Sequence, residues 1–397
     1  MKLYNILLIF LITFLFQDCN SPSDISKEES HTDILDTVLE KNEEEMILVD
    51  SFQTSIANLI SCKDGTYFDT IGDVNFANWW KSLSDEIDVD YTGLKTDRLN
   101  KMKEWSSDGF IQDNDTSLVF YPFSGPDFLH VYYLYPNANE YILLAREEIG
   151  SLPYEGNVWT SAPKETKKLV DRTYYFLRDV ILKSFFLTNN MKSHVREGDE
   201  ILLSLYWFLS RTEHNIVGVD RVTIDENGKI LIRQEEGQGI DGVRFHFIKE
   251  GETKVKKLTY FACDISDGGF KNKNPNLLVY LKNIRECNTF TKAASYLMHY
   301  SFFHEIRDVV LEKSITIFQD DTGIPYKYFN NDNWTVRHFG AYVKPPSNFA
   351  EDYDILYQQD LVALYKSQAS EKLPFSLGYH WVSSLQNQMF ITRSSKE

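Results

Sequence analysis

The stretch TFTKAASYLMHYSFFHEIRDVVLEKSITIFQDDTGIPYKYF, residues 289–329, determines how we interpret the rest of the chain. Side chains alternate in character over residues 293–299, which predicts a strand covered on both faces. Apolar residues at helical spacing follow over residues 303–310, and residues 315–317 predict a second strand. The stretch therefore predicts a strand, a helix and a strand, and it ends in the acidic turn at 319–325.

The composition is that of a globular protein with an acidic balance. The chain has 397 residues, of which 43% are hydrophobic and 14% aromatic, and its formal net charge is −17. Such a chain is long enough to bury one sizeable core or two cores. Nucleic-acid binding needs basic residues that neutralise phosphates, and here the balance has the opposite sign. The short basic run at 254–257 fits the solvated face of a strand, so we expect no nucleic-acid partner.

The first residues predict export from the cytoplasm. Lys2 precedes an apolar run at 6–16, which is shorter than the ~20 residues that span a bilayer. One positive residue before a short apolar core is typical of a secretory signal, so residues 1–18 are interpreted as a signal peptide. Cleavage before Cys19, with a palmitate-containing lipid on its sulfur, resembles the processing of a bacterial lipoprotein. The letters FQD at 16–18 depart from the usual pattern, which leaves an uncleaved anchor or ordinary signal cleavage as alternatives.

A polar, acidic segment at residues 19–45 predicts a tether between this anchor and the folded body. Asn20 follows the lipid-bearing position, where an aspartate would retain the protein in the inner membrane. The expected location is therefore the bacterial cell envelope, with the protein anchored to the outer membrane.

Cysteine usage allows at most one disulfide within the body. The chain has four cysteines, and Cys62, Cys263 and Cys287 remain after Cys19. Cys263 and Cys287 are a candidate pair. The alternative is that all three are small buried apolar residues. None has the CxxC spacing of a thiolate metal site.

The sequence after the tether predicts two parts. The first is an N-terminal part at residues 46–150, helical over 46–110, and the second is a main body at residues 151–397. One continuous domain is the alternative. Further helices are predicted at 164–186, 199–210, 274–281 and 360–367, and strands at 118–121, 141–145, 217–224, 229–233, 243–249, 254–264, 334–342, 375–381 and 389–392. Asn227-Gly228 is a strong hairpin signal. The expected fold class is α+β, a mixed and mainly antiparallel sheet with flanking helices and a helical N-terminal part.

Two matches to known motifs fail on physical grounds. Residues 237–242, GQGIDG, match the letters of a dinucleotide-binding loop. That site needs a helix directly after it, whereas residues 243–247 predict a strand. His304-Glu305 begins like a zinc-protease helix, but Asp308 occupies the place of the second histidine.

Three Asp/Gly turns at predicted strand ends remain as candidate sites, at 124–127, 264–269 and 319–323. Carboxylates beside hydroxyls suit a hard cation or acid–base chemistry if the turns converge in space. Asp and Gly are also what turns need for backbone reasons alone. The candidate catalytic residues are Asp127, Asp264, Asp267, Asp320, Asp321 and, as a general base, His299. The candidate metal ligands are Asp264, Asp267, Asp320 and Asp321.

Five short motifs carry a resemblance to a known family. They are SGPDF (124–128), DISDGGF (264–270), SYLMH (295–299), QDDTGIP (319–325) and LPFSLGY (373–379). From about Val119 to Trp381 the chain is similar to a family of exported bacterial proteins, lipoproteins among them, with no assigned activity. The last motif has Ser376-Leu377 where that family has Gly-Ile before Gly-Tyr. The resemblance supports the choice of these turns and implies no reaction.

Two functions remain open. The first is a membrane-anchored envelope lipoprotein that binds a ligand or a protein partner, because no complete catalytic signature is present. The second is an envelope hydrolase that uses the clustered aspartates, with or without a divalent cation. The sequence indicates no particular cofactor. Carboxylates within about 8 Å of one another across a cleft would favour the enzyme.

Overall fold

The computed structural model describes residues 48–66, 72–107, 117–152, 163–186, 199–233, 239–380 and 386–394. The predicted signal peptide, Cys19 and the tether lie outside the described residues. The compact unit that contains the described residues runs from residue 47 to residue 397. None of the helices in this described part combines the length and the apolar character that crossing a bilayer requires.

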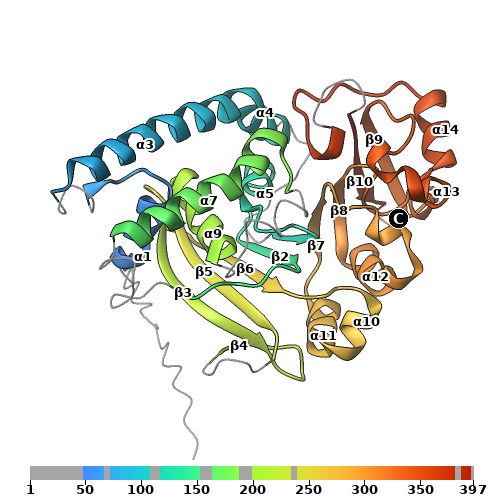
Figure 1. The fold of residues 1–397 in the computed structure, drawn as a ribbon. Coiled ribbons are helices and arrows are strands. Elements are labelled where there is room, and N and C mark those ends of the chain that lie inside the picture. Colours follow the sequence, from blue (N-terminus) through green and yellow to red (C-terminus); the bar gives the residue numbers. More distant parts are fainter. Residues whose placement is uncertain are drawn as a thin grey trace, which may run out of the picture. The chain divides into compact units, whose positions relative to one another are not determined.

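Within the described residues, a ten-stranded mixed sheet has the order β4-β3-β5-β6-β2-β1-β7-β8-β10-β9 (Figure 1). The strands are β1 (Leu118–Pro122), β2 (Glu140–Ala145), β3 (His214–Ile224), β4 (Ile230–Ile232), β5 (Asp241–Lys249), β6 (Val255–Ala262), β7 (Cys287–Thr291), β8 (Ser314–Gln319), β9 (Trp334–Gly340) and β10 (Asn387–Arg393). The central run β6-β2-β1-β7-β8 is parallel. The pairings on either side of it are antiparallel. The expected α+β class with a mixed, mainly antiparallel sheet is confirmed.

Helices cover both faces of the sheet and pack into two separate apolar clusters (Figure 1). The first cluster includes α1 (Ser51–Ile60), α3 (Val74–Leu94), α4 (Asn100–Trp105), α5 (Phe128–Leu134), α7 (Pro163–Lys183) and α9 (Asp199–Arg211). The second includes α10 (Asp267–Asn272), α11 (Pro275–Asn283), α12 (His304–Lys313) and α14 (Gln359–Ser367). β1 shows why both faces need cover: Val119 and Tyr121 join the first cluster, and Leu118 and Phe120 join the second.

Local sequence explains how several of these elements begin and end. α7 and α9 occupy the two segments with the clearest helical spacing, as predicted. Asp127 caps α5, and its carboxylate accepts a hydrogen bond of 3.3 Å from His130 N. The predicted hairpins are β3–β4 and β5–β6. Gly228 has a φ of +74° in the first turn, which a side chain would strain.

The central stretch departs from expectation at its start. The predicted strand at 293–299 is wrong, because β7 has ended and the chain turns sharply. Ala293, Ser295 and Tyr296 have left-handed φ angles of 49°, 52° and 56°, which non-glycine residues adopt at a cost. A 3₁₀ turn, Leu297–His299, follows. The predicted helix and second strand are confirmed as α12 and β8.

Two other expectations are corrected near the C-terminus and among the cysteines. The predicted strand at 375–381 is wrong: the described residues there include a 3₁₀ turn, Gly378–His380, and Trp381 lies outside them. Cys263 and Cys287 do not pair; both are buried and free, as is Cys62.

The segment after the dinucleotide-like motif at 237–242 forms a strand. Gly237 and Gln238 lie outside the described residues. β5 begins at Asp241, so the predicted strand is confirmed where a nucleotide site would need a helix.

Candidate functional site

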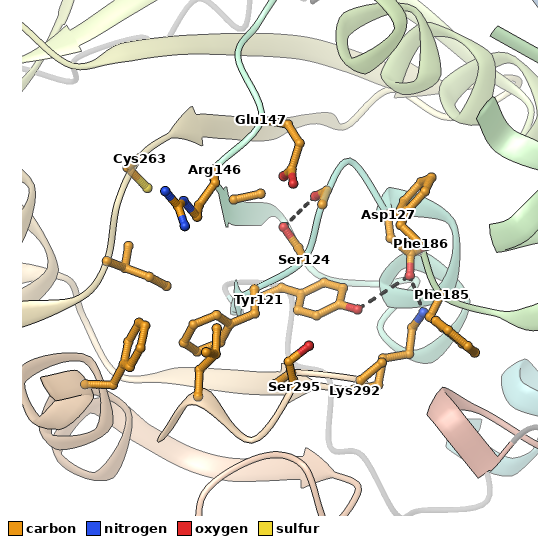
Figure 2. Close-up of a pocket in the computed structure, with 18 of the residues that line it drawn as sticks. Tyr121, Ser124, Asp127, Arg146, Glu147, Phe185, Phe186, Cys263, Lys292 and Ser295 are labelled. Carbon is orange, nitrogen blue, oxygen red and sulfur yellow. Dashed lines mark hydrogen bonds and ion pairs between the residues drawn. The ribbon is translucent and has the colours of Figure 1, made fainter. Parts of the chain in front are cut away.

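A cavity of about 340 Å³ lies at the C-terminal ends of the parallel strands (Figure 2). Its lining includes residues that directly follow four of these strands, among them Phe123, Arg146, Cys263 and Lys292. Parallel strands place their carboxyl ends at one edge of a sheet, so segments distant in sequence meet there. The cavity is therefore a consequence of the parallel centre.

The connections beside the cavity leave the sheet in opposite directions. β1 leads to α5, which packs into the first apolar cluster, whereas its neighbour β7 leads to α12, which packs into the second. At such a switch point no connection crosses over the gap between the two strand ends. Ligands of open α/β sheets characteristically bind in the crevice at this place.

The three Asp/Gly turns follow β1, β6 and β8. Two of them contribute to the cavity lining, and the third lies behind it. Ser124, Asp127 and Asp264 line the cavity directly. The turn after β8 lies behind the lining, where Asp320 accepts a hydrogen bond of 3.0 Å from Ala293 N. The structure thus gathers the turns around one place without bringing all their carboxylates into one cluster.

Asp127 is the centre of a buried charge network. Its side chain lies 2.6 Å from Lys292 Nζ and 2.9 Å from His130 Nδ1. Burial by itself would raise the pKa of Asp127, but His130 and Lys292 outweigh it and hold the pKa well below its usual range. Burial lowers the pKa of His130 to about 4, so the neutral ring donates its Nδ1–H to the carboxylate. The cavity therefore contains a fully buried Asp–Lys ion pair.

Two cations hold the end of α7 against this network. Lys292 donates a second hydrogen bond to the carbonyl of Ser184, just beyond α7. Arg98 lies in a π-helical turn, Lys95–Leu99, between α3 and α4. It is buried and donates to the carbonyls of residues 181–182 at 3.3 and 3.2 Å. Such π-turns occur frequently at functional sites.

Residues after β8 hold the left-handed turn after β7. Asp320 accepts from Ala293 N at 3.0 Å and from Thr322 N at 3.0 Å, one bond to each carboxylate oxygen. Ala294 N donates to Thr322 Oγ1 at 2.7 Å. Burial raises the pKa of Asp320 to about 6, with a further contribution from the neighbouring Asp321 carboxylate. These bonds explain why a strained turn persists beside the cavity.

Asp321 links the same turn to β10. The Tyr296 hydroxyl donates to one of its oxygens, and Asn387 Nδ2 donates to the other at 3.0 Å. Asn387 Oδ1 in turn accepts from Asp321 N at 2.8 Å. Both oxygens of this candidate ligand already accept hydrogen bonds from the protein, which is a structural role.

The turn after β6 separates its two carboxylates. Asp264 lines the cavity and accepts from Ser266 Oγ at 2.7 Å and from Lys273 Nζ at 3.2 Å. Burial opposes its ionisation, but these bonds hold the pKa of Asp264 below its usual value. Asp267 is outside the cavity lining and contacts His304 Nδ1 at 2.5 Å. That hydrogen bond raises the pKa of the exposed His304.

His299 lies apart from the cavity. It lines another hollow, together with Pro325 and Gln358, and packs edge-on against Tyr296 at 5.0 Å between ring centroids. Burial lowers the pKa of His299 to about 4. Among the described residues, no group of three or more His, Cys, Asp or Glu side chains could hold a metal ion. The metal-assisted hydrolase hypothesis thus has no coordination site in this part of the chain.

The closing Gly-Tyr pair completes the lining. Tyr379 places its hydroxyl 2.7 Å from Ser295 Oγ, and both residues line the cavity. Gly378 has a φ of +70°, and a Cβ there would collide with the Asp320 carboxylate. Only glycine allows the backbone to approach so closely. All five sequence motifs therefore reach the cavity or the residues directly behind it.

Aromatic rings form two groups in the lining. Phe123 and Phe303 are in contact at 5.9 Å between centroids, and Phe185 and Tyr379 at 4.8 Å. Figure 2 shows Phe185 and Phe186 on the side of Lys292 and Asp127, with Arg146 and Cys263 on the opposite side. The site combines apolar walls with a few charged and hydroxyl groups, as small-molecule sites usually do.

The serine hydroxyl groups of the lining, Ser124 and Ser295, have no adjacent base that would activate them as nucleophiles among the described residues. Ser124 Oγ donates to the carbonyls of Gly125 and Leu144, at 2.6 and 3.2 Å. The partner of Ser295 is Tyr379, whose pKa burial raises to about 12. A serine nucleophile needs an adjacent base, and the described residues show none bonded to either hydroxyl. The arrangement suits binding better than acyl transfer.

Sequence reasoning missed Lys292, His130, Arg98 and Arg146. One of them carried a usable signal: His130 interrupts the apolar run FLHVYYL, whereas Lys292 lies just before the strand predicted at 293–299. A charged or polar group in such surroundings must find a partner when buried. Arg98 carried no signal, because an arginine on an amphipathic helix is normally solvated.

A scan against models of protein families finds no match to this chain, and a search of curated proteins finds none either.

Proposed function

We propose that this chain is a ligand-binding protein of a bacterial cell envelope, held at the outer membrane by a lipid on Cys19. Its ligand site is the cavity at the ends of β1 and β7. The observation that supports binding is a cavity of about 340 Å³ at a switch point of the sheet. Small-molecule sites have volumes of ~300–1,000 Å³ and characteristically occupy such positions.

The buried ion pair supports the same proposal. Asp127 and Lys292 are each about 1% exposed at their side chains and line the cavity. A buried pair contributes little net stability, since desolvation offsets the attraction of the charges. Its place in the wall of a cavity therefore favours a role in ligand recognition.

Blocking the cavity tests the ligand site. Ala145 ends β2 and lines the cavity, so Ala145→Phe places a ring in the space. Ala363 is exposed on α14 outside this cavity, and Ala363→Phe is the matched control. We expect members of a fragment library to raise the Tm of the wild type and of Ala363→Phe, but not of Ala145→Phe. Equal responses of all three proteins would contradict the site.

The anchor is tested independently of the ligand site. Cys19→Ser removes the sulfur that carries the lipid, whereas Ser23→Ala changes the same segment and leaves it in place. We expect Cys19→Ser to leave the membrane fraction and Ser23→Ala to remain there, as judged by fractionation and immunoblotting. An unchanged distribution of Cys19→Ser would defeat the anchor proposal.

A further inference from the structure

We infer that the ligand is an organic anion with a planar, apolar body, and that its anionic group pairs with Arg146. This inference rests on the proposed function, of which it names the ligand class. It follows from the charges of the lining, from the hollow next to the cavity and from the aromatic walls.

Among the charged groups of the described lining, Asp127, Lys292 and Asp264 have ion-pair partners, whereas Arg146 and Glu147 have none. Asp127 is bound by Lys292, and Asp264 is bound by Lys273. Burial raises the pKa of Glu147 and so disfavours its charged form, although backbone N–H groups and the charge of Arg146 act in the opposite direction. The Arg146 guanidinium has no carboxylate within ion-pair distance in the described part of the chain, although it lines the cavity. An incoming anion would therefore find a donor in Arg146. An incoming cation would find Asp127 and Asp264 already bound, and at Glu147 a carboxyl group whose charged form burial disfavours.

Arg146 stands at the border between two spaces of different character. The apolar cavity and a neighbouring hollow of about 400 Å³ share Arg146, Cys263 and Asp264 in their linings. The second hollow also has Arg233, Lys273, Glu148 and Asp241 in its wall, and Arg233 pairs with Asp241 at 2.7 Å. A ligand that spans this border has its apolar part in the first space and its charged part in the second, with the guanidinium between them. Arginine suits this position because its planar fork binds a carboxylate through two hydrogen bonds.

The aromatic groups favour a flat body. Phe123 and Phe303 lie in one group, and Phe185 and Tyr379 lie in another. The first group continues outward: Phe302, which is 53% exposed, contacts Phe303 at 5.1 Å between centroids. Rings in offset or edge contact prefer planar partners, and they stabilise them beyond the area that is buried. A large exposed phenylalanine next to a lined cavity fits an entrance for an apolar ligand.

A matched set of probes tests the inference. The probes are 2-naphthoate, 2-naphthalenemethanol and 2-naphthylmethylammonium, which share one ring system and differ in charge. We expect wild-type protein to bind the naphthoate about tenfold more tightly than the alcohol, because charge-assisted hydrogen bonds are the stronger ones. The ammonium compound should bind no better than the alcohol. Affinities are measured by titration calorimetry at pH 7 and low salt.

Substitutions distinguish a direct contact between the anion and Arg146 from a general electrostatic effect of the protein's charge. Arg146→Gln should lower the naphthoate affinity about tenfold and leave the alcohol unchanged, and Arg146→Lys should retain part of the preference. Arg285→Gln is the control, since Arg285 is exposed, pairs with Glu140 and lies outside the cavity. Equal affinities for anion and alcohol, or equal losses in the Arg146 and Arg285 variants, would overturn the anionic class.

The naphthalene probes test the ligand class, and the fragment library with Ala145→Phe tests the ligand site, so the two proposals can fail separately. Failure of all three naphthalene probes overturns the planar anionic ligand. If library fragments still bind in a manner that Ala145→Phe abolishes, the cavity remains a ligand site. If they do not, the proposed function fails as well.

Discussion

Two turns of similar composition, DENG at 225–228 and DDTG at 320–323, have very different partners. Asp225 accepts hydrogen bonds from Asn227 N at 3.0 Å and from Lys229 N at 2.7 Å, and it is partly exposed to solvent. Asp320 is buried and accepts from Ala293 N, 27 residues away along the chain. The first turn serves its own backbone, and the second holds another segment in place.

The position in the sheet accounts for the difference. The turn at 225–228 joins the antiparallel strands β3 and β4, and among the described residues the Asp225 carboxylate accepts only from amides of this same hairpin, although Gly228 packs against α11. The turn at 320–323 ends a parallel strand, and the connection after β7 emerges directly beside it. Because several loops meet at the carboxyl edge of the parallel strands, a turn residue such as Asp320 can bind a neighbouring loop as well as its own backbone. The comparison teaches that an Asp/Gly turn acquires a further role where parallel strands end.

Breaking the ion pair at this edge should have the largest effect. Lys292→Met leaves the Asp127 carboxylate buried without its cation, and we expect a loss of about 3–5 kcal/mol in the free energy of unfolding. Urea denaturation measures it. The double variant Asp127→Asn/Lys292→Met should lose less than the sum of the two single variants. A cost below about 1 kcal/mol for Lys292→Met would mean that the pair is not buried as described.

The next largest effect should come from Asp320→Ala. This change leaves Ala293 N and Thr322 N without their acceptor, and each buried unsatisfied group costs about 1–3 kcal/mol. We expect a total loss of about 2–4 kcal/mol by chemical denaturation, in the lower part of the summed range, because the change also removes the cost of burying a carboxylate. Hydrogen exchange at Ala293 should also become faster. Unchanged exchange at that amide would show that the turn after β7 is held by other contacts.

The raised pKa of Asp320 predicts a pH dependence. Its pKa is about 6 in the fold against 3.8 for the free group, so the folded state binds the proton more tightly. The associated stabilisation is complete below pH 3.8 and is lost as the pH rises through 6. The free energy of unfolding of the wild type should therefore fall by roughly 2–3 kcal/mol relative to Asp320→Asn between pH 4 and 7. Parallel curves for the two proteins would contradict this shift.

The smallest effect should come from the hairpin turn. Asp225→Ala removes two local hydrogen bonds at a partly exposed site, and we expect a loss of about 0.5–1 kcal/mol. The same denaturation assay compares it with Asp320→Ala. Similar costs for the two variants would remove the distinction between the turns.

Prediction from sequence succeeded where a pattern is local. The helices α7 and α12 and the hairpin β3–β4 all follow from spacing or turn residues within a few positions. It failed at 293–299, where alternating residues predict a strand. The left-handed turn there depends on Asp320 and Thr322, which no local rule connects to it.

The candidate site was predicted in the same uneven way. Asp127 and Asp264 do line the cavity, because turns at strand ends were chosen and parallel strands bring such turns to one edge. Asp267 and His299 do not, since their turns direct them toward His304 and Tyr296. Whether a turn residue lines the cavity or lies behind the lining depends on which strands are its neighbours. The local sequence of the turn does not specify those neighbours.

By itself the sequence determined the α+β class, the helices and hairpins with local signals, and the turns beside which a site forms. Only the tertiary structure decided that the central strands run parallel, that Lys292 and Asp127 meet, and that Arg146 stands at the border of the cavity. The physical reason is the range of the interactions. Hydrogen bonds within a turn or a helix connect residues a few positions apart, whereas the carboxyl edge of a parallel sheet joins segments separated by more than a hundred residues.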